Sequence, residues 1–203
     1  MFALLVHDPV APAVPTHQTY FGGLPSMTSD SSWPVCRSCR GNMQFLGQLQ
    51  DAADHHIALF MCQNDPGMCD EWDPSAGGNG ALPIDGTALE VISPPATGEV
   101  TRAVSHGVRP MVFKEGDYGQ ACDAWLAAGN DALAILGSVG GVPDWIQGDE
   151  SPTCDYCSEP MNFVAQLEEG LDHRTAMNFG GRGRAYVFRC NCEHKTAKFL
   201  WQS

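Results

Sequence analysis

Residues 22–49 read GGLPSMTSDSSWPVCRSCRGNMQFLGQL, and residues 140–167 read GGVPDWIQGDESPTCDYCSEPMNFVAQL. Three motifs recur between the two stretches in the same order: GG-x-P, C-x-x-C and M-x-F-x-x-Q-L. All three return 118 positions later without a gap, as Cys36 and Cys154 show (154 minus 36). A period this long is not that of a solenoid, whose repeats are much shorter, so it indicates two related halves.

The similarity resumes after an insertion. Residues 59–62 (LFMC) resemble residues 187–190 (VFRC) at an offset of 128, so the second copy holds ten more residues, among them the glycine-rich run 179–183. We therefore expect a β-dominant α+β fold, made by internal duplication of a zinc-bearing β unit with pseudo-twofold symmetry. The expected parts of this one compact body are an N-terminal extension (1–21), a first repeat with a strand and helix insertion (22–132) and a second repeat (133–203).

Alternating side chains predict the strands. Residues 43–49 and 161–167 place Met, Phe and Leu on alternate positions, which is typical of half-buried strands. The β-rich segments 57–61 and 186–188 are the expected partner strands, and 89–92 and 110–113 are two further candidates. One helix is expected over 118–129, with Asp117 as its N-cap and with Tyr118, Cys122, Trp125 and Leu126 at helical spacing.

Eight of the nine cysteines fall into two sets of four. Each set has a C-x-x-C pair, which can clasp an ion from a tight turn, and a later pair that can complete a tetrahedral shell. The first expected site is Cys36, Cys39, Cys62 and Cys69, and the second is Cys154, Cys157, Cys190 and Cys192. We expect one zinc ion in each site, two per chain, and we interpret Cys122 as a buried thiol outside both sites.

The sequence is also compatible with other interpretations of the cysteines. Each C-x-x-C pair could form a redox disulfide, although no βαβ pattern surrounds it. A catalytic zinc would recruit a histidine, and His55, His56 and His194 lie near the ligands, with His194 able to replace Cys192. An iron–sulfur cluster uses the same ligands.

The charge balance limits the partners. The formal net charge is −13, from 11 Lys and Arg against 24 Asp and Glu. Such a surface repels phosphate backbones and attracts basic proteins, so we expect a basic client and no nucleic acid. The short apolar N-terminus lacks the features of a signal peptide, and no segment has transmembrane length, so we expect a cytoplasmic protein without a membrane partner.

Candidate partner-binding residues combine aromatic and acidic side chains. They are Trp72, Asp144, Trp145, Gln147, Asp149 and Glu150. The segment 144–150 also suits a turn leading into the second C-x-x-C pair. No catalytic residue is assigned: the run GGRG lacks the GxxxxGK[ST] pattern of a phosphate loop, and no Ser–His–Asp order can be argued.

These motifs resemble the bacterial YwqG-like family of unknown function and, more distantly, the programmed cell death protein 2 family. The resemblance runs from about Gly22 to Gln202, and the segments Pro143–Glu150 and Phe163–Gln166 carry it most specifically. It implies a duplicated, β-rich α+β architecture. It also implies a protein-binding role, either as a chaperone for a small-subunit ribosomal protein or as an immunity protein that inhibits a toxin.

Three functional hypotheses follow. We favour a zinc-stabilised protein-binding module, a chaperone or inhibitor of a basic protein. The alternative is an enzyme of unknown reaction that acts in the cleft between the two repeats, and it would need converging histidines, carboxylates or an open metal. A zinc-ribbon nucleic-acid binder is the third, and the negative charge opposes it.

Overall fold

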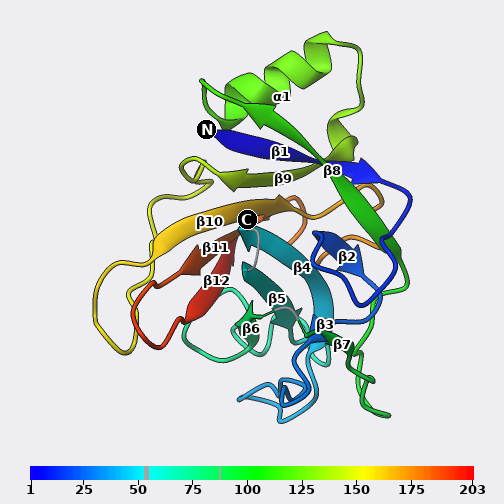
Figure 1. Ribbon diagram of the computed structural model, residues 1–203, viewed down its shortest axis with the longest axis vertical. Coiled ribbons are helices and arrows are strands. Elements are labelled where there is room, and N and C mark those ends of the chain that lie inside the picture. The colour runs from blue at the N-terminus through cyan, green and yellow to red at the C-terminus, as the bar shows by residue number, and fades with distance from the viewer. Residues whose placement is uncertain (53–54, 87) are drawn as a thin grey trace.

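The computed structural model describes residues 1–52, 55–86 and 88–203, and most of its strands belong to one sheet. The strands of this sheet are β1 (Phe2–Asp8), β2 (Tyr20–Gly22), β4 (Gln44–Ala52), β5 (His55–Met61), β6 (Asn79–Asp85), β8 (Ser105–Phe113), β9 (Ile135–Gly140), β10 (Asn162–Glu168), β11 (Arg184–Arg189) and β12 (Ala197–Gln202). They close into a barrel in the order β1-β8-β2-β4-β5-β6-β12-β11-β10-β9 (Figure 1). The expectation of a β-dominant chain is confirmed for the described residues.

Outside the barrel lie only short elements and one α-helix among the described residues. The strands β3 (Ser26–Met27) and β7 (Glu90–Val91) pair with each other. The helix α1 spans Tyr118–Ala127, and a 3-10 turn covers Ala132–Ala134. The strands predicted over 43–49, 57–61, 161–167 and 186–188 correspond to β4, β5, β10 and β11, and the segments 89–92 and 110–113 overlap β7 and β8.

Two series of four strands adjoin at the contact between β6 and β12. On one side of this contact follow β5, β4 and β2, and on the other follow β11, β10 and β9. The two four-strand series meet at the register pair Ala81 and Ala197. At the far side β1 and β8 close the barrel, because β1 pairs with both β8 and β9 and β8 pairs with β2. The segment 1–21 therefore contributes β1 to the barrel wall.

Apolar side chains fill the barrel and form a cluster around each cysteine group. The interior cluster includes Leu5, Leu49, Val164 and Phe199. A second cluster surrounds Cys36, Cys62 and Cys69, and a third surrounds Cys154 and Cys190. Each cysteine group thus belongs to an apolar layer of its own on the barrel.

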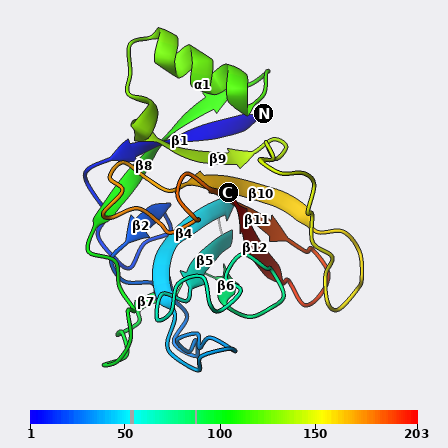
Figure 2. The ribbon, with the colours of Figure 1, turned by 180° about the vertical axis from the view of Figure 1, so that it is seen from behind.

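The helix α1 lies across the outer face of β1, at the end of the molecule away from the first C-x-x-C turn (Figures 1 and 2). It begins as predicted, since the Asp117 carboxylate accepts a hydrogen bond of 2.8 Å from the N–H of Gln120. Its buried residues are Tyr118, Ala121 and Trp125. Cys122 lies at the edge of this cluster, whereas Leu126, expected on the apolar face, is 44% exposed. The helix α1 has 10 residues, and none of the helices in the described part of the chain could span a bilayer.

A partly buried histidine makes the stability of this fold sensitive to pH. The ring of His106 in β8 lies against those of His7 and Phe21. Burial lowers the pKa of His106 to about 4, although its hydrogen bond to the carbonyl of Gly107 opposes this shift. In the unfolded chain the pKa is about 6.5, so the unfolded state takes up the proton first as the pH falls. Stability is therefore lost between these two pKa values, by about 1 kcal/mol from pH 7 to pH 5 once solvent screening of the partly exposed ring is allowed for.

Urea unfolding at both pH values checks this expectation. His106→Phe keeps a ring against Phe21 but cannot titrate, so its loss of stability between pH 7 and pH 5 should be smaller than that of the wild type. Effects of acid on the cysteine groups are common to both proteins and cancel in the comparison. Equal losses in the two proteins would contradict the assignment.

Candidate metal centres and a groove in the barrel wall

The first cysteine group joins a tight turn to the end of β5. Cys36 and Cys39 lie in the turn that precedes β4, Cys62 follows β5 directly, and Cys69 lies in the next loop. Their four Sγ atoms all lie within 4.8 Å of one another. Three of the four side chains are buried, and Cys39 is exposed.

The second group has the same construction on the other half. Cys154 and Cys157 lie in the turn before β10, Cys190 follows β11, and Cys192 comes two residues later. These four Sγ atoms also lie within 4.8 Å of one another. The structure thus brings together the two sets of four that the spacing predicts, and it leaves Cys122 outside both.

The two C-x-x-C turns have the same pattern of backbone hydrogen bonds. In the first turn the N–H of Cys36 donates to the carbonyl of Gly41, and in the second the N–H of Cys154 donates to that of Glu159. The residue after the second cysteine has a positive φ in both, 63° at Arg40 and 61° at Ser158. Because this left-handed residue turns the chain back, both cysteines of each pair can point to one centre.

The sulfur positions suit a metal better than a disulfide. The separations of paired Sγ atoms include 3.5 Å for Cys39 and Cys62 and 3.8 Å for Cys154 and Cys192. Tetrahedral ligands at a metal–sulfur distance of about 2.3 Å lie about 3.8 Å apart, whereas a disulfide is about 2.05 Å long. All nine cysteines are free. Two four-cysteine groups that can each hold a metal ion are therefore present.

The histidines weighed as ligands lie elsewhere. His194 stacks on Tyr156 with a centroid distance of 4.1 Å, and it is Cys192 that completes the second group. His55 contacts Arg189, and His56 lies 2.9 Å from His17 between ring nitrogens. A four-sulfur shell leaves no open position on the ion, which is typical of structural sites.

Hydrogen bonds to sulfur would stabilise the thiolate state of the ligands. The N–H of Gly41 donates to Cys39 and the N–H of Cys192 donates to Cys190, each over 3.4 Å. The hydroxyl of Thr196 lies 3.3 Å from Cys154 Sγ. This hydroxyl, with backbone N–H groups of the turn, lowers the pKa of the Cys154 thiol to about 6. Such donors around a metal shell orient the ligands and tune the ion.

A buried carboxylate holds the loop that supplies Cys69. Glu71 is 2% exposed, and its two carboxylate oxygens accept hydrogen bonds from the N–H groups of Gly67 (2.7 Å) and Cys69 (3.3 Å). The Asn79 amide in turn donates to the carbonyl of Glu71 over 2.7 Å. Glu71 therefore fixes the backbone on which the fourth sulfur of the first group sits.

Glu71→Gln should weaken metal binding at the first group by about 10- to 100-fold, the usual effect of losing a group that orients a ligand. The neutral amide accepts hydrogen bonds less strongly than the carboxylate and cannot serve both N–H groups as well. Metal transfer to a chromogenic chelator, followed over time, checks this result. Asp70→Asn, at an exposed position in the same loop, is the matched control and should transfer metal at the wild-type rate. An unchanged rate in Glu71→Gln would show that the carboxylate has no part in the site.

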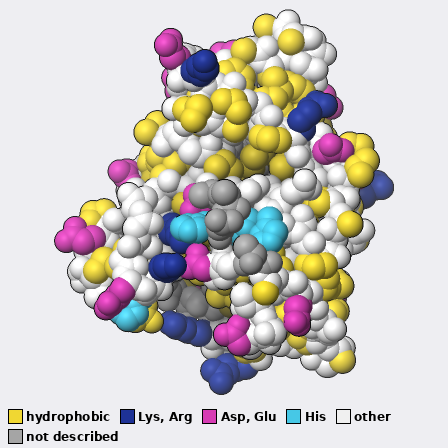
Figure 3. Space-filling model, viewed as in Figure 1, with side chains coloured by type: hydrophobic (Ala, Val, Ile, Leu, Met, Phe, Trp, Pro, Cys, Tyr) yellow, Lys and Arg dark blue, Asp and Glu magenta, His cyan; other side chains and the backbone are white. Residues whose placement is uncertain are grey.

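Ionic side chains link the two halves at the centre of one face of the molecule, where Figure 3 shows basic, acidic and histidine side chains together. The Arg189 guanidinium, on a side chain that is 5% exposed, lies 3.0 Å from Asp51 and 3.4 Å from Asp85. It also donates to His55 Nδ1 over 2.7 Å, and Lys195 lies 2.9 Å from Asp85. We name these five residues the Arg189 cluster.

The Arg189 cluster joins elements far apart in the chain. Asp51, His55 and Asp85 come from β4, β5 and β6, while Arg189 ends β11 and Lys195 lies in the loop beyond Cys192. A hydrogen bond from Lys195, together with the positive charges of Lys195 and Arg189, holds the pKa of Asp85 below its usual range. Both terminal nitrogens of the Arg189 guanidinium are thus engaged within the cluster, whereas its buried Nε has no hydrogen-bond partner among the described residues.

The candidate partner-binding residues fall in two places. The segment 144–150 folds over the end of β12, where the Gln202 side chain accepts from the N–H groups of Ile146 and Gln147. Trp72 is 41% exposed and contacts Trp201 edge to face, with centroids 6.1 Å apart. Because successive strand residues face opposite sides, Trp72 and the segment 144–150 meet opposite faces of β12.

Within this segment most side chains have partners in the chain. Asp144 lies 2.8 Å from the Arg184 guanidinium, and the ring of Trp145 lies 4.3 Å from that of Tyr186. Gln147 donates to the carbonyl of Ser203, and Asp149 accepts from the N–H of Ser151. Glu150 is exposed.

The glycine-rich run 179–183 encloses a carboxylate of the chain itself. The two oxygens of Glu169 accept hydrogen bonds from the N–H groups of Phe179 (3.0 Å), Gly181 (2.9 Å) and Arg182 (2.9 Å). Backbone N–H groups that converge in this way can hold an anion, and here Glu169 fills the position.

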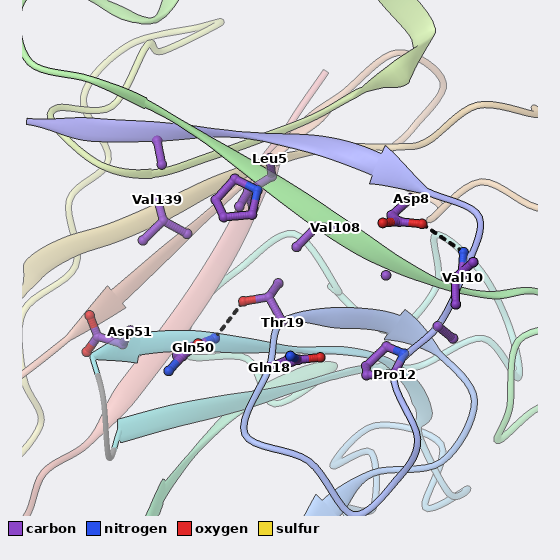
Figure 4. A pocket seen from close by; sticks show the side chains of 14 residues that line it. Leu5, Asp8, Val10, Pro12, Gln18, Thr19, Gln50, Asp51, Val108 and Val139 are labelled. Atoms are coloured by element: carbon purple, nitrogen blue, oxygen red, sulfur yellow. Dashed lines mark hydrogen bonds between the residues drawn. The ribbon is translucent and has the colours of Figure 1, made fainter.

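A groove of about 640 Å³ opens in the barrel wall between β8 and β4 (Figure 4). Its apolar floor is continuous with the barrel core and includes Ala3, Leu5, Val108 and Val139. Polar side chains form its rim: Asp8, Gln18, Thr19, Gln50 and Asp51. Two of these are carboxylates, and no Lys or Arg is among the lining residues in the described part of the chain. None of the sequence motifs predicts this groove.

The groove exists because β2 is short. β8 pairs with β1 from Gly107 to Phe113, but it pairs with β2 only from Ser105 to Gly107. β4 pairs with β2 at two positions, after which the N–H of Gln50 is bound by the Thr19 hydroxyl over 2.9 Å. The Thr19 side chain thus takes the place of a strand at this edge of β4, and the barrel wall has a gap between β4 and β8.

No protein-family model matches this chain, and no curated protein matches it closely enough to indicate a relationship. The similarity to YwqG-like proteins stays an expectation from the motifs.

Proposed function

We propose that this protein is a zinc-stabilised binding protein whose ligand is a basic protein client. The groove carries the proposal, since it combines an apolar floor with a rim that holds Asp8 and Asp51. Pockets of roughly 300–1,000 Å³ with apolar walls and a few polar groups are typical binding sites. The net charge of −13 would attract a basic client and speed its encounter with the groove.

Zinc is the metal that these two groups suit best. Four thiolates in a closed shell match structural zinc, and nine free thiols fit the reducing cytoplasm in which we place the protein. An iron–sulfur cluster would need the same ligands. A zinc protein should be colourless, whereas a cluster absorbs visible light, so an absorption spectrum separates the two.

Internal duplication with pseudo-twofold symmetry accounts for the arrangement of the barrel. The matching hydrogen bonds of the two C-x-x-C turns support it, as does the strand order on either side of β6 and β12. Both copies also have a bulge in the strand after the turn, at Phe45–Gly47 in β4 and at Phe163–Ala165 in β10. The two zinc-bearing halves, together with the strands β1 and β8, would then hold the groove open.

The role that fits this binding is that of a chaperone for a basic protein or an inhibitor of a basic toxin. Both are roles that the resemblance to YwqG-like and programmed cell death protein 2 proteins implies. An acidic surface suits both roles, because it can shield a positively charged partner. Nucleic acid is a poor ligand for the same surface.

The alternative is an enzyme that acts between the two halves. The Arg189 cluster favours it to the extent that a histidine and two carboxylates converge at this junction. Their ion pairs and hydrogen bonds are made to Arg189 and Lys195, which favours a structural role instead.

Gentle affinity purification from the native host tests the proposal. We expect one basic protein to accompany the chain in a 1:1 ratio, and the complex to form again from the purified components. A ribosomal protein would indicate a chaperone, and a toxin would indicate an inhibitor. Recovery of the metal-loaded chain alone would contradict the binding role and make a small molecule or a reaction the next hypothesis.

A further inference from the structure

We propose that the groove takes an extended segment of the client as an added β-strand, in the place that a longer β2 would fill. This inference rests on the proposed function and specifies how the client is held. The segment would pair with the free edge of β8 and lie over the apolar floor (Figure 4). Its backbone would supply the pairing and its side chains the selectivity.

The edge of β8 provides the first argument. From Val108 to Phe113 this strand is paired with β1 on one side, while β2 covers the other side no further than Gly107 among the described residues. An unpaired edge is a template for another chain. Pro110 has no N–H and can only accept a hydrogen bond, which restricts pairing at that residue without preventing it on either side.

The two faces of β8 provide the second argument. Met111 and Phe113 pack on the cluster below α1, so this face is covered. On the other face Val108 and Pro110 line the groove, and Val112 is 65% exposed. An added strand would cover these side chains and continue the barrel core.

Charge complementarity selects the occupant. Asp51 already lies 3.0 Å from Arg189, whereas Asp8 accepts only from the N–H of Val10 among the described hydrogen bonds. A Lys or Arg at one end of the segment would meet the Asp8 carboxylate. Alternate residues of the segment would be small and apolar, since Leu5 and Val108 already occupy the floor. The ligand class is therefore an extended basic segment with alternating apolar residues.

A phage-displayed library of linear 12-residue peptides, panned on the zinc-loaded protein, tests this inference. We expect enriched peptides with alternating apolar residues and Lys or Arg. Val139→Trp should fill the floor and weaken their binding at least tenfold. Val142→Trp, at a position that is 72% exposed and outside the groove, is the matched control and should bind like the wild type. Absence of enriched peptides, or equal binding by Val139→Trp, would overturn the inference.

A second measurement uses the wild-type protein alone and so does not depend on the folding of a variant. N-methylation of alternate amides in an enriched peptide removes backbone donors and keeps every side chain. Binding should fall at least tenfold for one of the two alternating sets. If both sets bind like the parent peptide, no strand is added. A co-purified client that binds wild type and Val139→Trp equally would refute the groove mode and leave the proposed function standing.

Discussion

Cys154→Ser should release one zinc ion and strongly destabilise the fold. Cys154 and Cys190 are buried in one cluster with Tyr186 and Phe188, so the metal shell is part of the apolar packing of that half. Structural zinc contributes about 10–16 kcal/mol of binding free energy in small zinc domains. A whole domain is stable by only about 5–15 kcal/mol, so loss of one ion should remove a large part of this stability.

Zinc stoichiometry and thermal unfolding by circular dichroism measure this result. We expect one ion per chain and a melting temperature lowered by at least 10 °C, and Cys36→Ser should behave in the same way. Cys122→Ser is the matched control, because Cys122 lies outside both metal groups, and it should keep two ions and the wild-type melting temperature. If the double variant Cys36→Ser/Cys154→Ser melts like the wild type, metal does not hold this fold together.

Arg189→Met should cost about 3–5 kcal/mol of unfolding free energy, the range for removal of one partner from a buried ion pair. The guanidinium, on a side chain 5% exposed, serves Asp51, Asp85 and His55 together. Methionine fills much of the volume but leaves Asp51 without its positive partner. Lys195 still forms an ion pair with Asp85, which keeps the expected loss of unfolding free energy within this range.

Urea unfolding at pH 7 with excess zinc measures the change, because saturation keeps both metal groups filled. Arg174→Met, at an exposed position, removes the same charge and should change the stability by no more than about 0.5 kcal/mol. Equal stability of the Arg189 variant and the wild type would show that the cluster does not join the halves. It would then favour the enzyme alternative, in which these groups are kept for a reaction.

The cysteine groups could be predicted from the sequence because their ligands lie close together in the chain or at the ends of recognisable strands. A C-x-x-C pair fixes two ligands through one turn, and the internal similarity assigns the remaining pairs. The strands next to these turns, β4 and β10, have clear alternation. The N-cap at Asp117 is a local signal of the same kind.

The closure of the barrel could not be predicted in this way, because it depends on pairing between distant segments. β6 contains Pro83 and β9 contains Gly137, and both residues weaken the pattern of a strand. The role of Glu71 was also hidden, since a carboxylate among other acidic residues resembles a solvated surface. The groove arises from the shortness of β2, which no motif records.

Native mass spectrometry of the purified protein tests most directly whether two zinc ions stabilise the folded chain. We expect a narrow charge-state distribution with a mass increment of two zinc ions, and stepwise loss of both ions as the chain unfolds in acid. A folded chain without metal, with the same narrow distribution, would contradict this role of zinc.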